Sequence, residues 1–304
     1  MDNMVLLKRL ELPTEKVDMV LDTDAFNEID DQFAIAFALK SPERVTVKAI
    51  YAAPFLNDKS VSPEDGMEKS YDEILKLLTL AGREDMKESV FKGSRRYLPD
   101  ENTPVESPAM LDLIERARGY SPEKPLYVVA IGAITNVASA LIAAPDIADQ
   151  IVIVWLGGHS TEWYDTKEFN MYQDIAAARV IFGSGAALVQ LPCMGVVSAF
   201  AVSGPELETW FKGDPLSEYL AKNSIAEAES YAKGRPWTRV IWDVTAVAFV
   251  CAPETLHSKL IPAPTPEYSG NYSFDPRRHL IRYVYHIDRD WLFGTLVTRI
   301  CGKS

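Results

Sequence analysis

The chain has 304 residues, of which 47% are hydrophobic and 24% are charged, a composition typical of a globular protein with a large core. Its formal net charge of −12 disfavours binding to nucleic acid, because proteins that bind a phosphate backbone carry basic patches. No run approaches the roughly eighteen apolar residues of a membrane-spanning helix, and no signal-peptide pattern opens the chain. We therefore expect a cytoplasmic protein without a membrane partner.

Short apolar segments alternate with helical patterns, which is typical of a mostly parallel sheet covered by helices on both faces. The apolar segments predict strands, buried on both faces, at residues 19–21, 45–52, 126–131, 151–156 and 187–191. Helices are predicted at residues 31–39, 66–80, 108–118, 136–144, 174–183, 215–232, 244–250 and 289–300. No domain boundary interrupts this alternation, so we predict a single α/β domain over residues 1–304.

The C-terminal region begins with a segment of different composition. Residues 261–278 are rich in Pro, Gly and Ser, which predicts a long surface loop. Residues 280–286 then alternate between apolar and polar side chains, a pattern that favours a strand with one exposed face. We therefore expect this strand to lie at an edge of the sheet.

The most informative segment is the acidic stretch at residues 21–34, LDTDAFNEIDDQFA. An apolar strand pattern precedes it and a helical pattern follows, so its carboxylates lie on a strand-to-helix turn. Ligands of open α/β sheets bind at such turns, at the carboxyl ends of the strands. Crowded aspartates repel one another, and a hard cation such as Ca²⁺ or Mg²⁺ relieves that repulsion.

Three other interpretations of the stretch are weaker. Helix capping and the helix dipole account for Asp30 or Asp31, but not for Asp22 and Asp24 at the end of a buried strand. A phosphatase of the haloacid-dehalogenase type would have a Thr where Phe26 stands. A dinucleotide site would need a glycine string after a strand, whereas GSGAAL at residues 183–188 follows a helix and is typical of a helix C-cap.

Four segments in order resemble the nucleoside hydrolase family (inosine–uridine-preferring ribohydrolases). The string DTDAFNEIDD is similar to the family motif DxDxxxDD, with two more residues before the acidic pair. The segments AIGAITNVASAL (130–141), LGGHSTEWYDTKEFNMYQDIAAARVIF (156–182) and IWDVTAVAF (241–249) resemble three later family motifs. The resemblance implies one domain with a Rossmann-like core, a bound Ca²⁺, and a homodimer or homotetramer.

The resemblance also implies a metal site. In it, Asp24 binds calcium and takes the proton of the attacking water, while Asp31, Asp243 and the carbonyl of Ile131 complete the protein ligands. Asp22 is then a buried buttress of the loop. Calcium takes six to eight oxygen ligands, and these groups with water and a sugar diol could supply them. We also expect Asp243 to cap the helix that follows it.

The same resemblance implies how a sugar is held. Asp30 would bind a ribose hydroxyl, and Glu168 and Asn170 match the family's sugar-binding pair, with Phe169 packed beneath the site. Cleavage of an N-glycosidic bond builds positive charge at the anomeric carbon, which surrounding carboxylates stabilise. Capping of its helix is the interpretation that we favour for Asn136.

The chain departs from the family pattern in ways that affect substrate choice. The longer loop adds Asn27 and Glu28, which either join the site or bulge into solvent. Trp242 stands where many relatives carry a His that protonates the leaving group, and an indole can stack on a base but cannot supply that proton. His159 is a possible substitute acid, although a structural role is the simpler expectation, and Asn57 matches a family Asn only if its loop is longer.

We therefore predict a calcium-dependent hydrolase that cleaves the N-glycosidic bond of ribonucleosides to ribose and a free base. Its substrate-contacting residues would be Asp30, Glu168, Asn170, Trp242, Asn27 and His159. The alternative is a ribose-binding or regulatory protein that keeps the metal site with little turnover. The substitution at Trp242 motivates this alternative.

Overall fold

The protein is built around a sheet of eight strands, seen in a computed structural model that describes residues 3–302. The strands lie in the order β3 (Val90–Lys92), β2 (Val45–Ala52), β1 (Val17–Thr23), β4 (Leu126–Ala130), β5 (Ile151–Leu156), β6 (Ala187–Leu191), β12 (Leu280–Ile287) and β9 (Leu256–Pro262). All neighbours are parallel except β12 and β9. This is the mostly parallel α/β fold that the sequence predicts.

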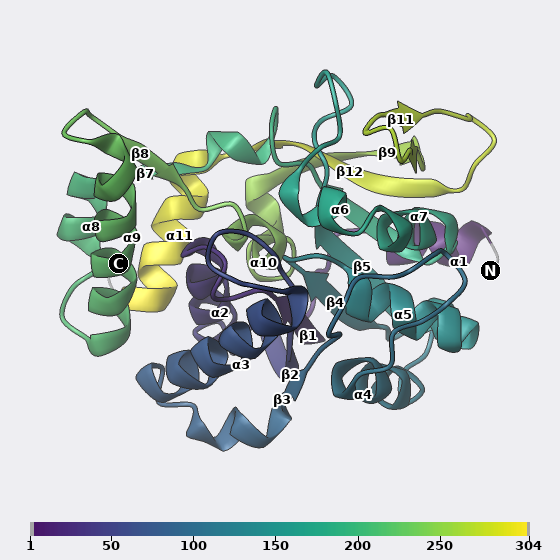
Figure 1. The fold of residues 1–304 in the computed structure, drawn as a ribbon, viewed down its shortest axis with the longest axis horizontal. Coiled ribbons are helices and arrows are strands. Elements are labelled where there is room, and N and C mark those ends of the chain that lie inside the picture. Colours follow the sequence, from purple (N-terminus) through teal and green to yellow (C-terminus); the bar gives the residue numbers. More distant parts are fainter. Residues whose placement is uncertain (1–2, 303–304) are drawn as a thin grey trace.

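Helices cover both faces of the sheet (Figure 1). One apolar cluster lies under α2 (Asp30–Leu39), α3 (Pro63–Leu80), α10 (Val244–Cys251) and α11 (Arg289–Cys301), and the other under α4 (Pro108–Ala117), α5 (Thr135–Ala143) and α7 (Ile175–Gly183). Within β1, Met19 and Leu21 belong to the first cluster and Val20 to the second, as the alternation of side chains along a strand requires. The sheet is therefore buried on both sides.

The remaining elements are short or peripheral. They are the helices α1 (Asn3–Arg9), α6 (Phe169–Gln173), α8 (Gly204–Trp210) and α9 (Pro215–Ala232), and the strands β7 (Ala201–Ser203), β8 (Thr238–Val240), β10 (Thr265–Pro266) and β11 (Tyr272–Ser273). Short 3₁₀ helices lie at Glu84–Ser89, Pro145–Asp149, Val197–Ala199 and Pro253–Thr255. Within residues 3–302, no helix combines the length and apolar character that crossing a membrane requires.

Two expectations for the C-terminal region were wrong. The strand β12 is not at the edge, because β9 pairs with its other side. Only Arg282 and Tyr283 of β12 pair with β6, so much of its length lacks a neighbour on that side, and its sequence keeps the alternation of an edge strand. The expected loop at residues 261–278 contains the end of β9 and the short β10–β11 pair.

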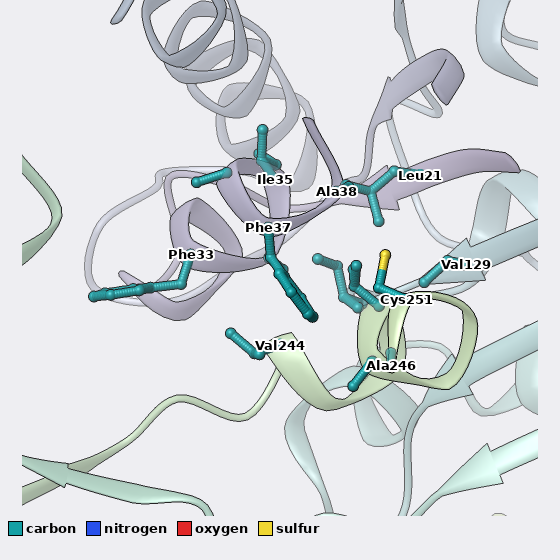
Figure 2. Packing of buried hydrophobic residues seen from close by; sticks show 14 of the residues in the cluster. Leu21, Phe33, Ile35, Phe37, Ala38, Val129, Val244, Ala246 and Cys251 are labelled. Carbon is teal, nitrogen blue, oxygen red and sulfur yellow. The ribbon is translucent and has the colours of Figure 1, made fainter. Parts of the chain in front are cut away.

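Helices α2 and α10 pack directly against each other on the sheet (Figure 2). All ten residues of α2 are buried, and residues 33–39, after its polar first turn, are apolar on all sides, as expected of a helix inside a core. Phe33 and Phe37 project from α2, and Val244 lies at the start of the facing helix α10 (Figure 2). This packing brings the N-terminal ends of both helices, with Asp31 and Asp243, to the same place.

The order of the strands marks the position of a ligand site. The chain runs from β1 outward to β2 and β3, then returns to β4 on the other side of β1. Such a reversal opens a crevice outside the carboxyl ends of the two central strands, where ligands of open α/β sheets bind. The segments that leave these two strands begin with Asp24 and Ile131.

Candidate metal and substrate site

A cavity of about 360 Å³ lies at this crevice. Its walls include the metal loop, which we define as residues 24–31, and the segments after β2, β4, β5, β6 and β8. The lining residues are Asp24, Asn27, Glu28, Asp30, Asp31, Asn57, Ile131, Leu156, His159, Lys167, Glu168, Phe169, Asn170, Cys193, Met194, Trp242 and Asp243. All predicted metal and substrate residues thus face one cavity, although they come from four separate parts of the chain, namely the metal loop and the segments after β4, β5 and β8.

Carboxylates from the starts of two helices converge in this cavity. Oxygen atoms of Asp30, Asp31 and Asp243 lie within 4.8 Å of one another, and all three residues are buried. The sequence grouped Asp24 with Asp31 and Asp243, whereas the tightest group contains Asp30 instead. Neither Ile29, the residue before α2, nor Asp243, before α10, makes a side-chain capping bond. The expectation that Asp243 caps its helix was therefore wrong, and its carboxylate points elsewhere.

Asp24 is fully buried beside this group. Both of its carboxylate oxygens lack a hydrogen-bond partner among the described residues. A Cβ at position 132 would lie only 3.0 Å from Asp24 Oδ1, so Gly132 lets the carboxylate pack against the backbone that leaves β4. A buried, unpaired carboxylate is costly, which indicates that a cation completes this environment.

The electrostatics of the cluster point to the same conclusion. Burial, followed by the charge of Asp31, raises the pKa of Asp24 well above its usual value. Burial and the charge of Asp30 do the same for the pKa of Asp31 and of Asp243. Without a cation these carboxylates would have to take up protons. A divalent ion with oxygen ligands removes that need, so the residues present fit a metal ion.

The segment after β4 joins the metal loop to the motif that is expected to bind sugar. Ile131 donates its N–H to the carbonyl of Asp22 at 2.8 Å. Its own carbonyl accepts a hydrogen bond from Asn170 Nδ2 at 3.2 Å, and the same nitrogen donates to Leu156 O at 3.0 Å. With both N–H groups of the amide engaged, Asn170 Oδ1 is the atom left to face the cavity.

Glu168 anchors its own segment. Its carboxylate accepts hydrogen bonds from the backbone N–H groups of Gly158, Asn170 and Met171 at 2.8–2.9 Å. Burial raises the pKa of Glu168, and these backbone donors oppose the shift. Phe169 does not pack beneath the site as expected: its side chain is 37% exposed and lines the cavity.

Asp22 lies behind the metal loop and is fully buried. Its Oδ1 accepts a hydrogen bond of 2.7 Å from Asn136 Nδ2, and burial raises its pKa to about 7. The prediction that Asn136 caps α5 was wrong. The N-cap position belongs to Ile134, and no side-chain bond is made there. Instead, Asn136 Oδ1 accepts a hydrogen bond from the backbone N–H of Ser94 at 2.7 Å, so Asn136 links the ends of β1 and β3.

The remaining predicted residues line the opposite walls. Asn27 is 6% exposed, and its Oδ1 accepts a hydrogen bond of 2.6 Å from Asn57 Nδ2, so the longer loop turns into the site. His159 accepts a 3.3 Å hydrogen bond at Nδ1 from the backbone of Met194, and burial lowers its pKa. This favours a neutral ring that carries its proton on Nε2. Trp242 lies beside Asp243 in the wall.

The sequence of residues 231–243 suggests a lid over a base, but it predicts no carboxylate partner for Arg239. Its guanidinium lies 2.6 Å from Glu28 and 3.8 Å from Asp30. Burial and the charge of Glu28 raise the pKa of Asp30 to about 7, and Arg239 opposes that shift. The available signal was its position three residues before Trp242, in a stretch that also contains Arg235.

The fold and site define an α/β protein with a buried carboxylate cluster at the switch point of a doubly wound sheet. The profile of the inosine-uridine preferring nucleoside hydrolase family matches residues 19–290. The chain belongs to this family and is a hydrolase that acts on N-glycosyl bonds. Its expected family membership is thereby confirmed.

Known relatives agree with this assignment. The pyrimidine-specific ribonucleoside hydrolase RihA of Citrobacter koseri is 28% identical over 253 residues, which cover 74% of this chain and 77% of that protein. A plant nucleoside hydrolase structure superposes with a TM-score of 0.76 at 22% identity, covering 95% of this chain and all of that one. A purine-preferring ribonucleoside hydrolase from Gardnerella vaginalis also superposes with a TM-score of 0.76 at 22% identity, covering 94% of this chain and 98% of that one. The two structures establish the shared fold.

Proposed function

We propose that the protein is a calcium-dependent hydrolase that cleaves ribonucleosides or related N-ribosides to ribose and a free base. The observation that carries this proposal is the pair of unpartnered oxygens on buried Asp24, next to the group of Asp30, Asp31 and Asp243. The family relationship supports the reaction class. The all-oxygen character of the cluster supports calcium as the ion.

Asp24, Asp31, Asp243 and the carbonyl of Ile131 would hold the ion. When bound, a divalent cation would supply positive charge that makes a water molecule easier to deprotonate. Asp24 would accept the proton of the attacking water, because its carboxylate would bind the same ion beside that water molecule.

The other residues would bind and orient the sugar. Asp30 accepts hydrogen bonds from a ribose hydroxyl, and Asn170 Oδ1 and Glu168 face another part of the ring. The surrounding carboxylates stabilise the positive charge that develops at the anomeric carbon. Trp242 and Phe169 offer apolar surface to a planar base, and the Nε2–H of His159 offers a hydrogen bond.

A second candidate is a ribose-binding or regulatory protein with little turnover, which is favoured by Trp242 at the position of an expected leaving-group acid. Hydrolysis of p-nitrophenyl riboside and of inosine, with calcium present and after chelation, separates the two. Cleavage that stops on chelation supports the hydrolase, and cleavage of p-nitrophenyl riboside alone points to an altered base pocket. Tight ligand binding without cleavage of either compound supports the binding protein.

The setting in which the enzyme works is also part of the proposal. All three cysteines are free thiols in the structure, which suits a reducing, cytoplasmic environment. The family relationship supports a homodimer or homotetramer. Light scattering on the purified protein measures that state directly.

A further inference from the structure

The two residues that lengthen the metal loop are held by cationic side chains from outside it. Lys59 Nζ donates to the backbone carbonyl of Asn27 at 2.7 Å. Arg239 Nη2, on β8, donates to Glu28 Oε2 at 2.6 Å. Each added residue therefore has its own cationic anchor, one from the segment after β2 and one from the strand before Trp242.

Glu227 of helix α9 connects the two anchors. Its Oε1 lies 2.7 Å from Lys59 Nζ and its Oε2 lies 3.4 Å from Arg239 Nη2. The side chain of Arg239 is only 12% exposed, and its Nη2 also lies 3.8 Å from Asp30 Oδ1. Arg239 is thus a nearly buried cation with three carboxylate neighbours. Removing its guanidinium would leave those three carboxylates without this cationic partner.

The cavity wall shows on which side of this network a ligand would lie. Asn27, Glu28 and Asp30 line the cavity, whereas Arg239, Lys59 and Glu227 do not. The side chain of Glu28 is 42% exposed. Arg239 holds its Oε2, and no described residue bonds Oε1, which is left to accept a hydrogen bond from a ligand. Any effect of Arg239 on a ligand therefore passes through Glu28 and Asp30.

We propose that Arg239 is a positioning residue for substrate binding, which fixes the carboxylates of Glu28 and Asp30 as acceptors toward the bound riboside. The proposal rests on the proposed function, because it assigns these carboxylates to the same substrate. A planar guanidinium suits this task, since its fork of N–H donors serves several carboxylates in fixed directions. A lysine could replace the charge but not the geometry.

The test compares R239Q with R179Q under saturating calcium. Arg179 is a matched control, because it is 22% exposed, lies 2.6 Å from Glu101 and 3.1 Å from Glu267, and does not line the cavity. We expect R239Q to raise KM for the cleaved riboside at least ~10-fold with kcat within ~3-fold, the pattern of lost uniform binding. R239K should recover part of this loss, and R179Q should leave both constants unchanged.

The contrary outcomes are distinct. An unchanged KM in folded R239Q, or the same change in R179Q, overturns the proposal. If R239Q does not fold, the variants E227Q and R239K are used to test the proposal. A raised KM in both supports it, and a normal KM in either overturns it. If wild-type protein cleaves no riboside, the proposed function fails. The dissociation constant of inosine, measured by calorimetry, then replaces KM in the same comparison of variants. Wild-type protein that neither cleaves nor binds overturns both proposals.

Discussion

Asn170 donates a hydrogen bond from Nδ2 to the carbonyl oxygen of Ile131, 3.2 Å away. This contact joins the motif expected to bind sugar to the backbone atom expected to bind metal. Leu156 accepts from the same nitrogen at 3.0 Å, so the amide bridges the ends of β4 and β5. The orientation of the Ile131 carbonyl therefore depends on the side chain of a residue 39 positions later.

Replacing Asn170 by Asp should destabilise the protein. An ionised carboxylate cannot donate to two carbonyls, and leaving buried polar groups unpaired costs about 1–3 kcal/mol. We expect N170D to lower the free energy of unfolding by about that amount, measured by urea titration. The matched change N102D, at an exposed loop position, should have no effect, and equal stability of the two variants would contradict the bridging role.

Replacing Asp24 by Asn should separate activity from stability. Turnover of p-nitrophenyl riboside should fall at least ~10²-fold, the lower range for loss of a general base. In a chelator, however, D24N should unfold at the same or a higher urea concentration than wild type, because it removes an unpaired buried carboxylate. The control D290N changes a carboxylate that is 93% exposed. It should change neither the turnover nor the urea concentration at which the protein unfolds. Near-normal turnover in D24N would refute its catalytic role.

Removing the metal should make stability depend strongly on pH. The pKa values of Asp22 and Asp30 are raised to about 7, so the folded state holds their protons more tightly than the unfolded state. Their contribution to stability is complete below about pH 4 and is lost as pH rises through 7. A bound ion favours the ionised carboxylates, so calcium should raise the melting temperature more at pH 8 than at pH 5. An equal increase at both pH values would contradict a metal site close to these two carboxylates.

Gly158 should not tolerate a side chain. Its φ is +75°, and an added Cβ would lie 2.2 Å from the hydroxyl of Tyr272. We expect G158A to cost at least ~1–3 kcal/mol in unfolding free energy, the range for a residue in a rarely populated backbone region. In the double variant G158A/Y272F the clash with the hydroxyl disappears, while the contact with Met171 Cε at 2.7 Å remains, so the combined loss should be smaller than the sum of the single losses. Strictly additive losses would argue against that contact.

Much of the sheet could be predicted because its strands are buried on both faces. The limits of β2, β5 and β6 agree with the sequence prediction, since these mainly apolar segments have clear ends. By contrast, β3, β7 and β8 have three residues each, too few for a periodic pattern. The position of β12 inside the sheet could not be predicted either, because it depends on pairing with β9 rather than on its own residues.

At the site, too, features set by residues close in sequence could be predicted, whereas contacts between distant residues could not. The metal loop was predictable because its aspartates are close in sequence and incompatible with a buried strand end. The partner of Asp22 was not, because Asn136 stands where a capping residue is common, and only the folded structure brings it to Asp22 Oδ1. The partners of Arg239 could not be predicted for a similar reason: Glu28 and Glu227 lie 211 and 12 residues away along the chain.

Helix α2 is enclosed by protein on every side, and this has a consequence for how the site exchanges its contents. Amide hydrogens in the middle of such a helix reach water chiefly when the whole domain opens. The metal loop is thus tethered to one of the slowest-opening parts of the chain. Ions and sugars should therefore enter and leave through movement of side chains along the cavity walls, while the backbone that carries Asp31 stays in place.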